Sequence, residues 1–133
     1  MKAGALSGIR VLDLADASAA FAGRLLADLG AEVILVEPGM GAPIRHRGPF
    51  AGERADPERA YAHLYFNANK HSVALDPTRA EDQDDFRGLV ASADVLIETA
   101  PVSERAARGL APEVLQALNP GLIHASITPF GPE

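Results

Sequence analysis

The chain has 133 residues, 47% of them hydrophobic, which suits one globular domain and is short for two. Its 18 acidic and 12 basic residues leave a net charge of −6, which argues against a nucleic-acid-binding surface. There is no cysteine for a disulfide or thiolate site, no apolar run approaching the roughly 20 residues of a membrane span and no secretory signal, so we expect a cytoplasmic protein.

The first predicted element is a buried strand over residues 9–14, a mostly apolar run rich in β-branched side chains. A helix should follow, capped by Asp16 or Ser18 and closed by Gly30. Its apolar positions fall at helical spacing: Phe21, Leu25, Leu26 and Leu29. A second apolar run over residues 33–36 then completes a βαβ unit, which predicts a right-handed crossover between parallel strands.

The rest of the chain continues this alternation after a Gly- and Pro-rich loop over residues 38–58. Asp76 and Pro77 are placed to begin a helix that buries one apolar face. The further elements that we expect are strands over 72–75, 95–97 and 122–127, and helices over 60–66, through Phe86, Leu89 and Val90, near 103–108 and over 112–118. The pattern predicts an α/β fold of Rossmann-like type, with a largely parallel sheet and flanking helices. No helix follows the last strand to cover it, which hints at a continuation of the chain.

The common catalytic signatures are missing from the sequence. It contains no G-x-G-x-x-G between a strand and a helix, no phosphate-binding loop of the G-x-x-x-x-G-K-[ST] type and no G-x-S-x-G. The four histidines have no ligand spacing, so we expect no metal site. His124 lies in an apolar strand and is expected to be a core or edge residue. The residues alone predict no nucleophile and no acid/base pair.

Parallel sheets bind ligands at the carboxyl ends of their strands, and two such ends look suited to a nucleotide. The small residues of the turn over 15–20 would let an anion approach the N–H groups that begin the helix. Glu37 ends the second strand, where an acid can meet a ribose hydroxyl; it could equally be an exposed acid. The basic residues around Arg45 could receive a small polyanion or form a solvated loop. These residues indicate a nucleotide- or CoA-binding domain.

Five segments resemble the family III CoA-transferases and acyl-CoA racemases, also called the CaiB/BaiF family. These segments are spread over nearly the whole chain and are residues 6–14, 24–38, 67–76, 93–98 and 118–123. The family moves CoA between carboxylic acids or racemises an acyl-CoA, and its members form interlocked homodimers. The resemblance therefore implies a single N-terminal CoA-binding domain over residues 1–133, within a larger protein whose other part or second copy is its partner.

The resemblance also implies which residues contact CoA or acyl-CoA. Lys70 corresponds to the family's motif lysine near the CoA phosphates, and Arg45 to the arginine of its Pro-Thr-Arg motif. The complete set of expected binding residues is Ser18, Ala19, Glu37, Arg45, Asn69, Lys70, Glu98 and Thr99. Coenzyme A is the only cofactor implied, as substrate or acyl carrier.

The chain departs from the family pattern at its site. The family's Glu-Asn-Phe reads Glu98-Thr99-Ala100 here, and the aspartate that becomes acylated lies beyond residue 133. We therefore expect the chain alone to be inactive, with no catalytic residue of its own. Two hypotheses stay open, an enzyme part that binds CoA and a degenerate, non-catalytic module that binds it weakly or not at all. A Rossmann-type dehydrogenase is a third, disfavoured by the missing glycine motif.

Overall fold

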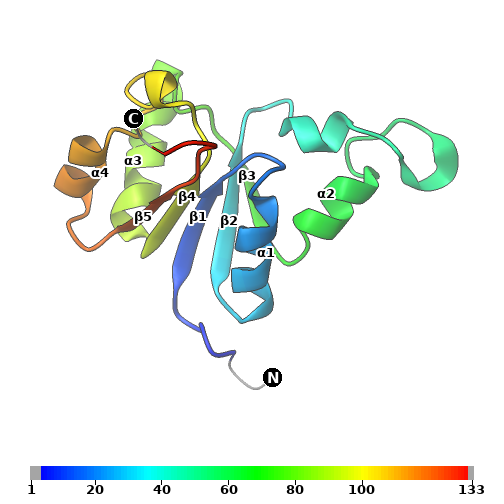
Figure 1. Ribbon diagram of the computed structural model, residues 1–133, viewed down its shortest axis with the longest axis horizontal. Helices are drawn as coiled ribbons and strands as arrows, with labels where there is room; N and C mark the ends of the chain where they lie inside the picture. The colour runs from blue at the N-terminus through cyan, green and yellow to red at the C-terminus, as the bar shows by residue number, and fades with distance from the viewer. Residues whose placement is uncertain (1–3, 132–133) are drawn as a thin grey trace.

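A computed structural model describes residues 4–131. Five strands form one sheet in which every neighbouring pair is parallel, in the order β3-β2-β1-β4-β5 (Figure 1). The strands are β1 (Arg10–Leu14), β2 (Glu32–Glu37), β3 (His71–Ala74), β4 (Val95–Glu98) and β5 (Ile123–Ser126). The prediction of an α/β fold of Rossmann-like type is confirmed, and the sheet is parallel throughout.

Four helices connect the strands and lie on both faces of the sheet (Figure 1). They are α1 (Ala20–Asp28), α2 (Tyr61–Phe66), α3 (Gln83–Ser92) and α4 (Pro112–Leu118). The strand order runs outward from β1 to β3 and then restarts at β4 on the other side of β1. This reversal places a crevice beside β1, at the point where α/β sheets bind ligands.

Two apolar clusters form the core, one on each face of the sheet. Leu12, Leu96 and Phe86 belong to the cluster under α3 and α4, where Leu12 and Leu96 have no exposed surface. Val11, Val33 and Ile97 belong to the smaller cluster under α1. Successive residues of β1 alternate between the two clusters, as the period of a β-strand requires.

The buried side of α1 differs from the prediction. Phe21, Leu25 and Leu29 are 42%, 47% and 51% exposed, although they form the expected apolar face. The side of α1 that meets the sheet carries mainly small residues, including buried Ala20 and Gly23, and of the four expected apolar positions only Leu26 packs against the core there. The outward positions are four residues apart and therefore form one stripe along the helix.

Three predicted local features are also corrected by the structure. Neither Asp16 nor Ser18 caps α1, whose N-cap is Ala19; the Asp16 carboxylate accepts hydrogen bonds from Ser18 instead. Asp76 likewise accepts from Thr78, and α3 begins only at Gln83. Near 103–108 the only helical segment is a single 3₁₀ turn, Val102–Glu104. In the first two cases a short polar side chain binds its own turn rather than a helix start.

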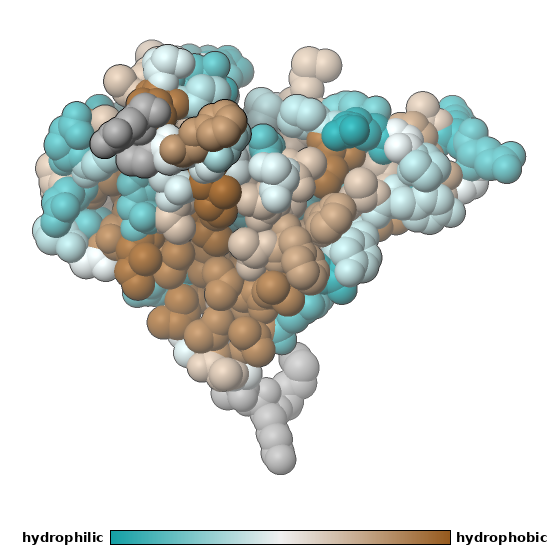
Figure 2. Space-filling model, viewed as in Figure 1, coloured by the Kyte–Doolittle hydropathy of each residue, from teal (hydrophilic) through white to brown (hydrophobic). Residues whose placement is uncertain are grey.

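The strand β5 lies at the edge of the sheet, and its α1-side face has no helix over it among the described residues (Figure 1). Ile123 is 64% exposed and Ile127 is 40% exposed. Figure 2 shows the apolar side chains gathered in the lower centre, over the sheet and α1. The prediction that the last strand lacks a covering helix holds for residues 4–131. No helix in this part of the chain has the length and hydropathy to cross a membrane.

Candidate functional site

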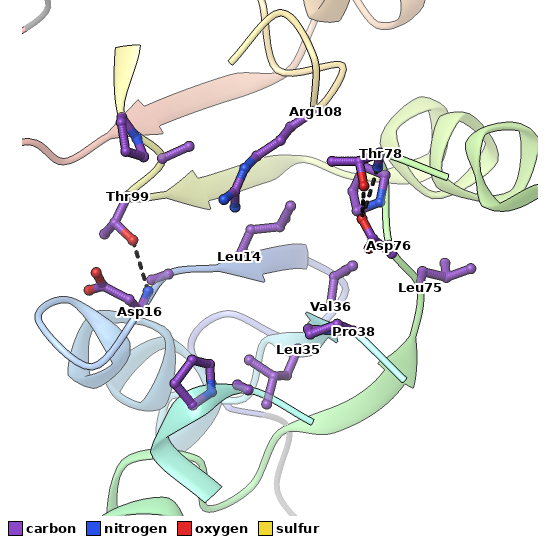
Figure 3. Close-up of a pocket in the computed structure, with 16 residues that line it drawn as sticks. Leu14, Asp16, Leu35, Val36, Pro38, Leu75, Asp76, Thr78, Thr99 and Arg108 are labelled. Atoms are coloured by element: carbon purple, nitrogen blue, oxygen red, sulfur yellow. Dashed lines mark hydrogen bonds between the residues drawn. The ribbon is translucent and has the colours of Figure 1, made fainter. Parts of the chain in front are cut away.

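A cavity of about 490 Å³ lies at the carboxyl ends of β1, β2, β3 and β4 (Figure 3). Its floor is apolar and includes Leu14, Val36 and Leu75, each at or beside a strand end. Polar side chains stand around it, namely Asp16, Asp76, Thr78, Thr99 and Arg108. An apolar cavity of this size with a few converging polar groups is typical of a site for a small molecule.

Hydrogen bonds fix the polar rim of this cavity. The backbone N–H of Asp16 donates to Thr99 Oγ1 at 2.8 Å, which ties the turn after β1 to the loop after β4 (Figure 3). Opposite them, the Asp76 carboxylate accepts from the N–H and the hydroxyl of Thr78 at 2.9 and 2.6 Å. These bonds from Thr78 lower the pKa of Asp76, so the rim carries a carboxylate at neutral pH.

Arg108 is the cation of this cavity. Its side chain reaches over the cavity from the loop that follows the 3₁₀ turn Val102–Glu104, and it points toward the space above Leu14 (Figure 3). The guanidinium bonds Glu104 at 2.5 Å and stays 45% exposed, so several of its N–H groups are open to a ligand. Nothing in the sequence pattern singles out this arginine.

A second cavity of about 410 Å³ adjoins the first on the other side of the β1–α1 turn. Small and apolar residues dominate its lining, together with the polar side chains of Ser18, Arg47 and Asn67. The two cavities share part of their walls: Ala15, Asp16, Leu35, Ala42 and Pro43. They therefore form two neighbouring compartments of one crevice, each with an exposed arginine.

Glu37 and Arg45, two of the predicted binding residues, bind each other beneath this crevice. Arg45 donates from Nε and Nη2 to the Glu37 carboxylate, with a shortest distance of 2.6 Å, and from Nη1 to Glu58. Burial by itself raises the pKa of Glu37, but the hydrogen bonds from Arg45, Ser72 and Ala42 outweigh it and hold the pKa at about 2. Because these donors occupy Glu37, the expected contact with a ribose hydroxyl does not fit this arrangement.

Lys70 also lies beneath the crevice rather than in it. Its side chain is 1% exposed, and its ammonium donates to Asp13 Oδ2, Ala20 O and Asn67 Oδ1 at 2.7, 2.8 and 2.8 Å. An ammonium has three hydrogens, so no donor is left for a phosphate. The expected direct contact between Lys70 and the CoA phosphates therefore does not fit this structure.

The remaining expected residues divide between the crevice and its surroundings. Thr99 lines the first cavity and Ser18 the second, while Ala19 is buried at the start of α1. Glu98 has no exposed surface and lies 3.3 Å from both Arg105 and His124. Asn69 lies near the other end of α1, where its amide donates to Asp28 at 2.7 Å. Only Ser18 and Thr99 face the space that a ligand could enter, and their contact with CoA stays a prediction.

Sequence reasoning missed most of the polar residues of the crevice. Asp76 and Thr78 come two and four positions after β3, so the rule that ligands bind at strand ends could have identified them; Thr99 was expected only from the family resemblance. Arg47 was grouped with a basic loop but not assigned to a site. Arg108 comes ten positions after β4 in an irregular segment, and only the folded chain brings it to the cavity. In residues 4–131 no three His, Asp or Glu side chains gather closely enough to hold a metal ion.

Comparisons with known proteins agree with the fold. The model of CoA-transferase family III matches residues 6–133. A succinate–glutarate CoA-transferase of Agrobacterium fabrum is 45% identical over 130 residues, which are 95% of this chain and 32% of that protein. A subunit of succinyl-CoA:(R)-benzylsuccinate CoA-transferase of Thauera aromatica is 34% identical, over 94% of this chain and 30% of that protein.

Solved structures show the same fold and a similar partial coverage. A CaiB/BaiF family protein of Brucella suis superposes with a TM-score of 0.86 at 38% identity, over 96% of this chain and 34% of that one. The protein Rv3272 of Mycobacterium tuberculosis superposes with a TM-score of 0.84 at 35% identity, over 98% of this chain and 36% of that one. The chain thus spans about a third of the length of the proteins that it matches.

Proposed function

The chain belongs to CoA-transferase family III, and on that premise we propose that it is the N-terminal, CoA-binding part of an enzyme that transfers CoA between carboxylic acids. The observation that carries the proposal is the crevice at the carboxyl ends of β1 to β4, with Arg108 above an apolar floor. CoA joins an anionic nucleotide to a long, neutral pantetheine arm. The crevice offers arginines that can meet the phosphates and apolar walls along which the neutral arm can lie.

Individual residues of the crevice suit particular groups of CoA. The Arg108 guanidinium can hold a phosphate through charge-assisted hydrogen bonds, and Arg47 offers a second such contact. The carboxylates of Asp16 and Asp76 would repel phosphate but can accept hydrogen bonds from ribose hydroxyls. We therefore expect the phosphates on the Arg108 side of the first cavity, away from Asp76.

The transfer reaction itself needs a carboxylate nucleophile at the acyl carbon, which the family supplies as an aspartate. We propose that this aspartate lies outside these 133 residues and that the chain alone does not transfer CoA. A cytoplasmic location and a homodimeric assembly also remain predictions. Incubation with succinyl-CoA, the donor in the name of the Thauera relative, and a free carboxylic acid tests the first point. Formation of a new acyl-CoA by the chain alone would contradict it.

Calorimetric titration with CoA and with pantetheine tests the binding proposal. The wild type should bind CoA, and Arg108→Ala should weaken that binding by about ten- to a hundredfold, since a hydrogen bond to a charged group contributes about 1.5–3 kcal/mol. Pantetheine, which lacks the phosphates, should bind both proteins equally. Arg87→Ala is the matched control because Arg87 is a 57% exposed arginine on α3 outside the crevice. No heat at millimolar CoA would favour the non-catalytic module instead.

A further inference from the structure

The chain buries a complete ion pair directly behind the crevice. Lys70 Nζ and Asp13 Oδ2 are 2.7 Å apart, and their side chains are 1% and 0% exposed. Burying two charges is costly, so such a pair is not explained by stability alone. The residues that form hydrogen bonds with Asp13 and Lys70 indicate a further role for the pair.

Each hydrogen bond of the pair ends on a residue of the crevice wall. Asp13 Oδ1 accepts the N–H of Ala15 at 3.0 Å, and Ala15 lines both cavities. Lys70 donates to the carbonyl of Ala20 and to the side chain of Asn67, and both of these residues line the second cavity. The pair therefore joins the start and end of the turn over residues 15–20 to the segment before β3.

Helix α1 has a glycine where it packs against the pair. Gly23 in α1 passes so close that a Cβ atom there would lie 2.0 Å from Asp13 Oδ2 and 3.1 Å from Lys70 Nζ. The start of α1 has no side-chain cap, so no cap residue fixes the turn from above. Asp13 and Lys70 hold the turn from beneath at Ala15 and Ala20, alongside the hydrogen bond from its Asp16 N–H to Thr99 Oγ1.

We propose that Lys70 is a positioning residue for CoA binding: by neutralising Asp13 it fixes the turn over residues 15–20 and the Asn67 side chain, against which CoA lies. Lys70 does not touch the phosphates. The inference rests on the proposed function for its ligand and on the described contacts for its mechanism. In this proposal exposed arginines bind the phosphates, and Lys70 holds residues of the crevice wall in place.

A double-mutant cycle separates positioning from direct contact. The variants are Lys70→Met, Asp13→Asn and the double variant, with Arg87→Met as a control that removes an exposed cation elsewhere. Asn at position 13 keeps the oxygen that accepts from Ala15. Each single variant leaves one buried charge without a partner, which should lower Tm by more than about 10 °C. The double variant removes both charges and should be more stable than either single variant.

Affinity for CoA, measured by calorimetry, should follow the same order. Each single variant should bind CoA at least about tenfold more weakly than the wild type, and the double variant should recover most of that loss. Direct contact with phosphate predicts a different pattern. Asp13→Asn would then bind CoA as well as or better than the wild type, and the double variant would bind as weakly as Lys70→Met. Either of these results would overturn the proposal, even where a single variant fails to fold.

Amide hydrogen exchange tests, without any ligand, whether Lys70 fixes the turn over residues 15–20. The amides of residues 15–20 should exchange faster in Lys70→Met than in the wild type, and the double variant should lie between them. Unchanged exchange in Lys70→Met would overturn the positioning role. If the wild type does not bind CoA, the proposed function fails, and the exchange experiment still tests whether Lys70 builds the wall.

Discussion

Each of the three central strands carries a buried carboxylate near its carboxyl end. Asp13 on β1, Glu37 on β2 and Glu98 on β4 are 0%, 4% and 0% exposed. Each has a basic partner, respectively Lys70, Arg45 and Arg105. Arg105 Nε lies 3.3 Å from Glu98 but without hydrogen-bond geometry, so this third pair is the most loosely joined. Since unpaired buried charges are strongly disfavoured, these partners fix the loops that supply them.

Gly23 is the residue most tightly constrained by such a pair. We expect Gly23→Ala to destabilise the protein by about 1–3 kcal/mol, because its methyl group would overlap the Asp13 carboxylate. Gly88→Ala in α3 is the matched control, since nothing lies within 4 Å of its added Cβ. There the gain in helix propensity should stabilise by up to about 1 kcal/mol. Urea denaturation measures both, and equal effects of the two substitutions would contradict the close packing at Gly23.

The lowered pKa of Glu37 predicts how stability depends on pH. The pKa is about 2 in the folded protein and 4.5 for an ordinary glutamate. The folded state therefore binds the proton less readily than the unfolded chain. The contribution of Glu37 to stability should be complete above about pH 4.5 and be lost as the pH falls toward 2.

Thermal unfolding between pH 2 and 6 measures this contribution. Glu37→Gln cannot ionise and should lower Tm at neutral pH while flattening its fall in acid. Glu113→Gln, an exposed acid at the start of α4, should leave the acid limb as steep as in the wild type. An acid limb that Glu37→Gln leaves unchanged would show that this pair does not carry the pH dependence.

At the scale of elements, α1 shows where a helical pattern misleads. Phe21, Leu25 and Leu29 point outward, while small residues and Leu26 meet the sheet. Phe21 contacts the rings of Tyr65 and Phe66 on α2, with ring centroids 6.2 Å apart, so part of the outer stripe is used to dock α2. The helix therefore has two apolar sides, and its hydrophobic spacing could not show which one is buried.

Two leucine substitutions compare the exposed side of α1 with the buried core. Leu25→Ala should cost less than about 1 kcal/mol because that side chain is 47% exposed on α1. Leu96→Ala in β4 should cost about 2–5 kcal/mol because Leu96 is completely buried in the larger core cluster. Chemical denaturation of the two variants gives the comparison. A large loss for Leu25→Ala would mean that the outer stripe of α1 is covered in solution.

Over the whole molecule, α3 and α4 cover one face of the sheet, whereas on the α1 side (the open face) no described helix covers β5. The α3 and α4 side buries the larger core cluster, whereas Ile123 and Ile127 of the β5 side remain exposed. The chain matches about a third of its relatives' length. An apolar surface of this kind is expected to promote association.

The open face predicts how the isolated chain behaves at high concentration. Ile123→Lys should reduce light scattering at high protein concentration while changing stability by no more than about 0.5 kcal/mol, because Ile123 is 64% exposed. Ala91→Lys places the same charge on an exposed position of α3, on the opposite face, and should leave the scattering unchanged. Equal scattering by both variants would show that the open face does not drive association.

The order of the elements and the position of the crevice follow from the amino-acid pattern alone. Apolar runs of strand length alternate with helical segments, and that local pattern is enough to predict a parallel sheet with a binding site at its strand ends. Ser18, in the turn after the first strand, could be placed at the crevice for this reason, whereas Thr99 was placed there by the family resemblance. The resemblance to CoA-transferase family III was confirmed because it rests on segments spread along the chain.

The role of each charged residue follows from contacts that exist only in the folded chain. Lys70 and Asp13 are 57 positions apart, and nothing local shows that they form a buried pair while Arg108 reaches the cavity. The side of α1 that is buried was also decided there, by the room that Gly23 leaves for this pair. Burial and pairing depend on contacts between distant segments, so they follow from the packed sheet and not from periodicity along the chain.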